Sequence, residues 1–152
     1  MEEYCYKKNV LIKTIPTIGF NVEEIKYKEM NFVIWDVGGQ YELRVLLKHY
    51  YQNTDEVILV EFSSDRNRIG EAAEEFNQIF ENEEHKDSTI LVISNKQDII
   101  VSLNTGEITE KLGLEKIKIR NLIVQGTYSI NGQKLKEELD WLFSVFKLRE
   151  RE

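Results

Sequence analysis

Short apolar runs alternate with amphipathic helical patterns along this chain of 152 residues, and this alternation limits its possible folds more than any other feature. Continuous apolar runs occupy 57–62, 89–94 and 122–125. Strands separated by helices of roughly 10 to 15 residues form crossover units, and these give a mostly parallel sheet with helices on its faces. With 41% apolar residues, we expect an α/β fold in which residues 1–152 form a single domain.

The segments between and after the apolar runs predict helices. An apolar stripe over 69–80 predicts a long helix that begins near Asp65. Asn104 and Glu107 have the spacing of a capping box, and Gly113 is typical of a helix end. Two further helices are indicated by apolar positions at helical spacing, within 43–50 and 135–146.

The N-terminal part predicts an antiparallel ribbon. Residues 20–28 and 32–36 have the composition of two strands joined across Glu29, Met30 and Asn31. The alternation in the first strand indicates that one face of the ribbon is exposed. By contrast, the run 57–62 is broken only by Glu61, so we expect both faces of that strand to be covered.

Charge and cysteine content exclude several classes of protein. A formal net charge of -7 argues against nucleic acid or anionic lipid as a partner, because both attract basic surfaces. Cys5 is the one cysteine and cannot form an internal disulfide, which is typical of a reducing compartment. No apolar run approaches the roughly 18 residues of a membrane span, and Met1-Glu2-Glu3 lacks a myristoylation glycine. We therefore expect a cytoplasmic protein without a direct membrane anchor.

The first motif, Asp36-Val37-Gly38-Gly39-Gln40, follows an apolar strand. A carboxylate at a strand end can hold a magnesium ion through water, and a following glycine lets its backbone N–H approach a terminal phosphate. A neighbouring glutamine can orient an attacking water without acting as a base. A strand that simply ends in a Gly-Gly turn has the same residues, so both interpretations stay open here.

The second motif, Asn95-Lys96-Gln97-Asp98, directly follows the apolar run 89–94. A carboxylate such as that of Asp98 can accept hydrogen bonds from both the ring N–H and the exocyclic amine of guanine, a pair that adenine does not offer. The structural alternative is an Asx-rich turn after a strand. Because α/β sheets bind ligands at the carboxyl ends of their strands, the two motifs together indicate a guanine-nucleotide site.

Five segments spread over nearly the whole chain match the motifs of one family. They are Ile15-Pro-Thr-Ile-Gly-Phe-Asn-Val22, Trp35-Asp-Val-Gly-Gly-Gln40, His49-Tyr-Tyr-Gln-Asn-Thr54, Asn95-Lys-Gln-Asp98 and Leu139-Asp-Trp-Leu142. They resemble the Arf and Arf-like (ADP-ribosylation factor) family of small GTPases. The resemblance implies a P-loop small-GTPase-like three-layer sandwich, whose mostly parallel sheet has one antiparallel edge ribbon. It also implies a GTP-binding and GTP-hydrolysing switch in vesicle or membrane trafficking, with GTP or GDP and Mg²⁺ as ligands.

The resemblance assigns roles near the terminal phosphate by position. Thr17 is similar to the first-switch threonine that binds magnesium and senses that phosphate. Asp36 is similar to the carboxylate that holds magnesium through water, and Gly39 to the backbone donor to the phosphate. Gln40 is similar to the catalytic glutamine that orients the attacking water.

For the base, the resemblance implies that Asn95, Lys96 and Asp98 read guanine and cover the ribose. The family's third base-contacting loop, usually small-Ala-[Lys/Thr], matches Tyr128-Ser129-Ile130. Ser129 can offer its backbone N–H there, although the flanking residues differ from the family pattern.

Phe20, Trp35 and Tyr50 match the aromatic triad through which the active form of the family meets effectors. By periodicity alone, they would be interpreted as core or strand aromatics, Trp35 in particular. Together, at the family's positions, they imply a partner surface for effectors. The resemblance further implies exchange factors and GTPase-activating proteins as partners, and peripheral association with endomembranes through such partners.

One departure from the family concerns the P-loop. No Gly-x-x-x-x-Gly-Lys-[Ser/Thr] motif occurs in the 152 residues, and aligned on Pro16 the chain begins within the family's first helix. The expected domain is therefore incomplete at its N-terminus and misses its first strand. Losing about five charge-assisted hydrogen bonds of roughly 2 kcal/mol each weakens binding by roughly seven powers of ten. We therefore expect GTP, GDP and Mg²⁺ to bind weakly or not at all to this chain.

The missing strand also leaves a gap in the expected sheet. The two strands on either side of the gap then have three alternatives. They close up, they pair with a second copy of the chain, which is self-association at the gap, or they leave unpaired edges. Three hypotheses follow: a truncated Arf-like GTPase, a nucleotide-independent effector-binding module, or a poorly folding chain.

A smaller departure is Glu61-Phe62, where the family usually has Val-Asp. Because side chains alternate along a strand, the acid at 61 faces the opposite side from an acid at 62.

Overall fold

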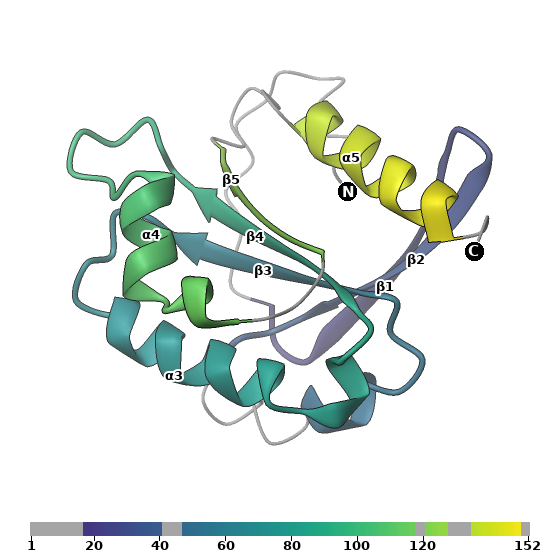
Figure 1. Cartoon of the computed structure of the whole chain (residues 1–152), viewed down its shortest axis with the longest axis horizontal. Coiled ribbons are helices and arrows are strands. Elements are labelled where there is room, and N and C mark those ends of the chain that lie inside the picture. The colour runs from purple at the N-terminus through teal and green to yellow at the C-terminus, as the bar shows by residue number, and fades with distance from the viewer. Residues whose placement is uncertain (1–16, 41–46, 118–120, 128–134, 150–152) are drawn as a thin grey trace. The chain divides into compact units, whose positions relative to one another are not determined.

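The computed structural model of the chain describes residues 17–40, 47–117, 121–127 and 135–149. These residues form an α/β fold with a parallel three-stranded sheet and an antiparallel two-stranded ribbon (Figure 1). The chain divides into two compact units. The ribbon unit comprises Met1–Gln52 with Leu139–Glu152, and the sheet unit comprises Asn53–Glu138.

The sheet unit is built on three parallel strands in the order β3-β4-β5. They are β3 (Glu56–Phe62), β4 (Thr89–Asn95) and β5 (Leu122–Gly126). The helices between them are α3 (Ile69–Phe80) and α4 (Thr105–Lys111) (Figure 1). The alternation of apolar runs and helical patterns therefore does produce crossover units and a parallel sheet, as the sequence predicts.

Apolar side chains of both helices pack on one face of this sheet. On β4, Ile90 and Val92 are completely buried on that face, and Leu59 of β3 lies beside Val92 in the ladder. The buried members of the cluster are Phe76, Ile90, Val92, Leu103, Ile108, Leu112 and Leu114. Because burying one large apolar side chain contributes about 1.5–3 kcal/mol, this cluster is the main source of stability in the sheet unit.

The predicted capping box is present at the start of α4. Asn104 Oδ1 accepts a hydrogen bond from the backbone N–H of Glu107 at 3.0 Å, and Glu107 Oε2 accepts one from the backbone N–H of Asn104 at 2.9 Å. Gly113 follows the helix with a φ of 69°, a left-handed conformation that glycine adopts without strain. These two signals define a helix of only seven residues.

The ribbon unit contains β1 (Phe20–Tyr27) and β2 (Met30–Val37), which pair antiparallel. This pairing confirms the predicted ribbon. The turn differs by one position from the prediction across 29–31, because Tyr27 pairs directly with Met30 and leaves Lys28 and Glu29 as the corner. Lys28 accordingly has a positive φ of 54°.

One face of the ribbon packs on α5 (Leu135–Arg149), and the opposite face is exposed. On the packed face, the rings of Phe32 and Phe146 lie 6.1 Å apart between centroids. The exposed face carries Phe20, Val22, Val33 and Trp35, with exposed fractions of 49%, 43%, 58% and 50%. The half-exposed ribbon that the sequence predicts is therefore observed, with an apolar outer face.

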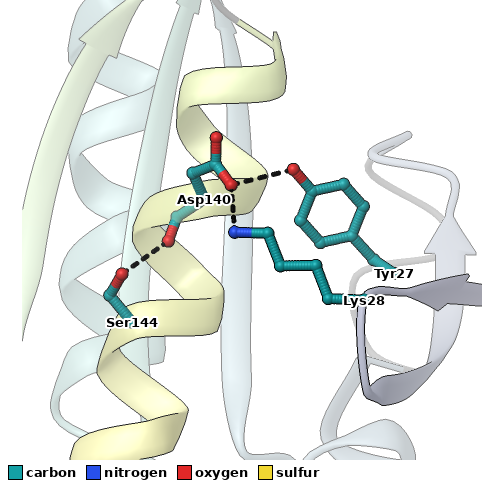
Figure 2. A network of polar contacts seen from close by, with 4 residues as sticks. All are labelled: Tyr27, Lys28, Asp140 and Ser144. Carbon is teal, nitrogen blue, oxygen red and sulfur yellow. Dashed lines mark hydrogen bonds and ion pairs between the residues drawn. The ribbon is translucent and has the colours of Figure 1, made fainter.

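Polar contacts fix the corner of the ribbon to α5, as Figure 2 shows. The Asp140 carboxylate accepts a hydrogen bond from the Tyr27 hydroxyl at 2.9 Å and pairs with the Lys28 ammonium. The Ser144 hydroxyl donates to the backbone carbonyl of Asp140 at 2.8 Å. Beyond these, Lys147 pairs with Glu29 at 2.8 Å. The helix α5 thus pairs with both residues of the turn, Lys28 and Glu29.

Several predicted element boundaries move in the structure. α3 begins at Ile69 instead of near Asp65, because Asp65–Arg68 forms turns in which the Arg68 N–H donates to the Asp65 carbonyl at 3.2 Å. Of the helix predicted within 43–50, residues 41–46 lie outside the described residues. Short 3-10 turns occupy Lys48–Tyr50, Glu83–His85 and Leu114–Lys116. None of the described helices is both long and apolar enough to cross a membrane.

Contrary to the prediction for 57–62, the strand β3 is not covered on both faces. Within the described ranges, β2 pairs only with β1, and β3 pairs only with β4. Ile58, Val60 and Phe62 are 41%, 57% and 46% exposed. The prediction that both faces of the strand at 57–62 are covered is therefore wrong: Leu59 packs on the core cluster, whereas the face that carries Ile58, Val60 and Phe62 is exposed.

Candidate functional site

Three residues that the sequence assigns to the terminal phosphate lie together at one end of the ribbon. The Thr17 hydroxyl donates a hydrogen bond to Asp36 Oδ2 at 3.2 Å. The side-chain amide of Gln40 donates to the Thr17 carbonyl at 2.9 Å. The backbone N–H of Gly38 donates to the Gly19 carbonyl at 2.9 Å, which ties the two segments together. We call Thr17, Asp36 and Gln40 the phosphate-side cluster.

Asn21 belongs to the same neighbourhood, although the sequence analysis missed it. Its side-chain amide donates to Asp36 Oδ2 at 3.3 Å, and it lies opposite Asp36 in the ribbon ladder. The signal that reveals this residue is the strand register, which the motifs do not contain. The hydrogen bonds from Thr17 and Asn21 both end on Oδ2. They orient the Asp36 side chain without using its Oδ1 atom.

The oxygen atoms of this cluster fit a magnesium ion. Magnesium prefers oxygen ligands, and in nucleotide sites it is usually held by one or two carboxylates, phosphate oxygens and water. Thr17 and Asp36 present a hydroxyl and a carboxylate in contact with each other. No group of three or more His, Cys, Asp or Glu side chains suited to a metal occurs in the described part of the chain.

Gln40 has an unused acceptor, and Gly39 has open space beside its backbone. The Oε1 atom of Gln40 is buried and accepts no hydrogen bond from the described residues, and a buried acceptor without a donor costs about 1–3 kcal/mol. A Cβ atom added to Gly39 would meet no atom within 4 Å, so the space beside its backbone is open. These features suit a water molecule at Gln40 and a close approach to the backbone at Gly39.

In the sheet unit, hydrogen bonds fix Asn95 at the end of β4. Its backbone carbonyl accepts from the N–H of Ser63 at 3.1 Å and also from the Ser63 hydroxyl. Its side-chain oxygen accepts from the N–H of Lys96 at 2.8 Å and from the Thr127 hydroxyl at 3.5 Å. Asn95 therefore shapes the loop that carries the next three residues of its motif.

Gln97 is a second residue whose part the sequence analysis did not identify. Its side-chain amide donates to the Ser94 hydroxyl at 2.9 Å and to the Leu103 carbonyl at 2.8 Å. Its backbone N–H donates to the Thr127 carbonyl at 3.0 Å. A Cβ on Gly126 would approach Gln97 Cγ to 3.3 Å, so a glycine at that position leaves room for the glutamine. Gln97 thus faces inward and anchors the loop.

Lys96 and Asp98, on either side of Gln97, are both exposed. Within the described residues, the Asp98 carboxylate makes no hydrogen bond and no ion pair. Its side chain is exposed, and such a carboxylate can accept two neighbouring N–H groups of a purine. Lys96 has a φ of 62°, and its ammonium lies 3.9 Å from the centroid of the Phe62 ring. Ser129 falls in the range 128–134 and lies outside the described residues.

The predicted aromatic triad forms a contiguous cluster in the ribbon unit. The ring centroids are 5.4 Å apart for Phe20 and Trp35, 5.6 Å for Phe20 and Tyr50, and 5.5 Å for Trp35 and Tyr50. Such pairs contribute about 0.5–1.5 kcal/mol each beyond their buried area. Phe20 and Trp35 nevertheless keep half of their surface exposed, so they are not core aromatics.

Glu61 lies on the opposite face of β3 from Phe62, since side chains alternate along the strand. Burial raises the pKa of its carboxyl from 4.5 to about 7, and the charge of Asp65 adds to this effect while Arg68 opposes it. In the folded chain the proton is therefore bound more tightly than in the unfolded chain. The stability linked to this group is present below pH 4.5 and is lost as the pH rises through 7.

We expect Glu61→Gln to raise the melting temperature by about 2–4 °C at pH 8 and to leave it nearly unchanged at pH 4. At pH 4 the wild-type carboxyl is mostly neutral in the folded and the unfolded chain, whereas at pH 8 it is charged and half-buried in the folded chain. Circular dichroism melts at the two pH values measure the difference. Glu74→Gln, a change at an exposed position on α3, is the control and should leave both melting temperatures unchanged. An equal shift of the Glu61 variant at both pH values would contradict the account.

Comparisons with known proteins agree with this architecture. The model of the ADP-ribosylation factor family, Arf, matches residues 4–146. Among solved structures, the chain is similar to the Arl6 BBS3 small GTPase from Trypanosoma brucei with bound nucleotide analogue GppNp, with a TM-score of 0.83 and 24% sequence identity. The match covers 95% of this chain and 89% of that chain. At this identity the likeness shows the fold, and it confirms the small-GTPase-like architecture that the sequence motifs imply.

Proposed function

Because the chain belongs to the ADP-ribosylation factor family, whose model matches residues 4–146, we propose that it is an Arf-like guanine-nucleotide-binding protein of vesicle or membrane trafficking. We further propose that residues 1–152 act as one such domain, and that this chain binds its nucleotide weakly. The observation that carries the proposal is the phosphate-side cluster, in which Thr17 contacts both Asp36 and Gln40.

In this proposal each member of the cluster has a role toward the terminal phosphate. Thr17 and Asp36 hold a magnesium ion, and the backbone N–H of Gly39 donates to the phosphate. A bound magnesium ion would neutralise charge on the phosphate oxygens. Asn21 and Thr17 keep Asp36 oriented through their hydrogen bonds to its Oδ2 atom.

Gln40 is the residue proposed to act in hydrolysis. Its buried Oε1 atom accepts a hydrogen bond from the attacking water, while its amide group stays fixed on the Thr17 carbonyl. A glutamine in this role orients water without removing its proton. Hydrolysis in this chain is slow, because the 152 residues contain no Gly-x-x-x-x-Gly-Lys-[Ser/Thr] loop to stabilise charge on the transferring group.

The base is proposed to bind at the loop after β4. Asp98 accepts the two N–H groups of guanine, and Lys96 covers the base and ribose. Asn95 shapes the loop, and Ser129 contributes a backbone N–H. The exposure of Asp98, with no partner in the described residues, supports its part in this proposal.

Calorimetric titration of the purified chain with GDP, GTP, ADP and ATP in the presence of Mg²⁺ tests the proposal. We expect guanine nucleotides to bind more weakly than micromolar and adenine nucleotides to bind more weakly still. The weakness follows from the absent phosphate loop, whose loss removes roughly seven powers of ten from the affinity. The sample is first shown by size-exclusion chromatography to be folded and monomeric, since the β2 and β3 edges offer pairing sites to another copy. Binding of GDP tighter than micromolar would contradict the account.

A second candidate function is a nucleotide-independent module for effector binding. The aromatic triad favours it, because these three rings pack on one another through ring contacts alone and Phe20 and Trp35 remain half-exposed. In either case the proposed partners are effectors, exchange factors and GTPase-activating proteins of the Arf type. Through them the chain would associate peripherally with endomembranes from the cytoplasm. Equal effector affinity with and without GTP distinguishes this candidate from a switch.

A further inference from the structure

A contact at the base-reading loop has no counterpart in the sequence motifs. The ammonium of Lys96 lies 3.9 Å from the centroid of the Phe62 ring, within the range at which a cation is attracted to an aromatic face. Phe62 ends β3 and lies opposite Asn95 in the ladder with β4, so the ring is beside the first residue of the base-reading motif. It is 46% exposed, and Lys96 is exposed as well.

The backbone around this contact is rigid. Lys96 adopts a left-handed φ of 62°, and its N–H is held by the side chain of Asn95 at 2.8 Å. Its carbonyl accepts from the Ser102 hydroxyl at 2.7 Å and from the N–H of Ile99 at 3.1 Å. The four single bonds of the lysine stem can rotate, and among the described residues the Phe62 ring is the group that the ammonium contacts.

We propose that Phe62 is a positioning residue for Lys96, whose side chain it fixes in place to cover the base and ribose of a purine nucleotide. The inference rests on the proposed function, because it assumes that Lys96 contacts the nucleotide. A free lysine loses rotamer entropy when it binds a ligand. A lysine already held on an aromatic ring loses less, so the ring increases nucleotide affinity without touching the base-selective carboxylate of Asp98.

Replacing the Phe62 ring by an aliphatic side chain should weaken nucleotide binding. Phe62→Leu keeps an apolar side chain of similar size at the end of β3 but removes the cation–π contact. We expect it to weaken GDP binding about threefold, with the ratio of GDP to ADP affinity unchanged. Phe62→Tyr retains an aromatic face and should bind GDP as the wild type does. Val60→Ala, on the same exposed face of β3 two residues away, is the matched control and should bind unchanged.

The contact itself is measured by NMR without any nucleotide. In wild type, the ε-CH₂ protons of Lys96, assigned by their loss in Lys96→Met, should be shifted upfield by the ring current of Phe62. The shift should persist in Phe62→Tyr and Val60→Ala and disappear in Phe62→Leu. Unshifted ε-CH₂ protons in wild type would overturn the proposal, whatever the nucleotide titration shows.

A GDP titration with Mg²⁺, followed by NMR on the same samples, tests the positioning role. If Phe62 acts through Lys96, the double variant Phe62→Leu, Lys96→Met binds GDP as weakly as Lys96→Met alone. Additive losses, or Phe62→Leu binding as tightly as wild type, would overturn the proposal while the proposed function stands. If the wild-type chain binds no GDP, the proposed function and the positioning role are both overturned. The ring-current measurement then shows whether the contact between Lys96 and Phe62 is nevertheless present.

Discussion

Asp98→Asn is expected to remove the preference of the chain for guanine over adenine nucleotides. The carboxylate accepts two hydrogen bonds from guanine, and hydrogen bonds to a charged group contribute about 1.5–3 kcal/mol each. An asparagine presents its own amide hydrogens toward the same donors, so GDP affinity should fall by about tenfold or more. Competition between GDP and ADP, followed by NMR at millimolar nucleotide, measures the change.

Asp55→Asn is the matched control for this prediction. It removes the same charge from an exposed aspartate of the sheet unit, directly before β3 and therefore at the opposite end of that strand from Phe62. It should leave GDP affinity and base preference as they are in the wild type. If the Asp98 variant still prefers guanine, the exposed carboxylate is not the group that reads the base.

The second large effect concerns the exposed face of the ribbon. Trp35→Ala is expected to weaken the binding of an Arf-type effector domain by about thirtyfold, equivalent to the 2 kcal/mol or more typical of an interface hot spot. The indole contacts both Phe20 and Tyr50 at centroid distances of 5.4 and 5.5 Å, so its removal also frees the other two rings. Biolayer interferometry against a panel of such domains, with and without GTP, provides the measurement.

Val33→Ala is the control on the same strand. Val33 is 58% exposed and lies two residues from Trp35 on the same outer face, outside the triad. Its truncation should change effector affinity less than threefold. Equal losses in the two variants would show that the whole ribbon face, and not the aromatic cluster, meets the partner. An unchanged affinity of the Trp35 variant would remove the triad from the partner surface.

Much of the fold follows from local sequence signals. The capping box at Asn104 and Glu107 and the glycine at 113 define α4 because each signal satisfies a helix end within a few residues. The alternation in 20–28 likewise predicts the ribbon, whose first strand is Phe20–Tyr27 in the structure. The predicted start of α3 and the predicted corner of the ribbon were less accurate, because the first depends on the turn at Asp65–Arg68 and the second on the strand register.

The exposure of β3 could not be predicted from its composition. A run such as 57–62 is apolar on both faces, and its composition does not tell which of the two faces is covered by packing. The half-buried state of Glu61, which raises its pKa to about 7, has the same origin in packing. Both corrections depend on long-range contacts that no short motif records.

The residues of the candidate site were likewise predicted only in part. The motifs identify Thr17, Asp36 and Gln40, and the structure brings these three together through hydrogen bonds. Asn21 escaped notice because its contact with Asp36 depends on strand register. The role of Gln97 was not predicted, because its side chain anchors the loop after β4 although its motif is otherwise associated with ligand binding. Motif reading thus finds the residues that face a ligand and misses those that hold them in place.

A residue-resolved nucleotide titration tests the central claim most directly. Amide spectra of the ¹⁵N-labelled wild-type chain are recorded during addition of GTP with Mg²⁺, and separately of ATP with Mg²⁺. The account predicts that GTP shifts the amides of Gly39 and of Lys96–Asp98 only at concentrations above micromolar, and that ATP at the same concentration shifts them far less. Equal responses to the two nucleotides, or GTP-induced shifts that leave these amides unchanged, would contradict it.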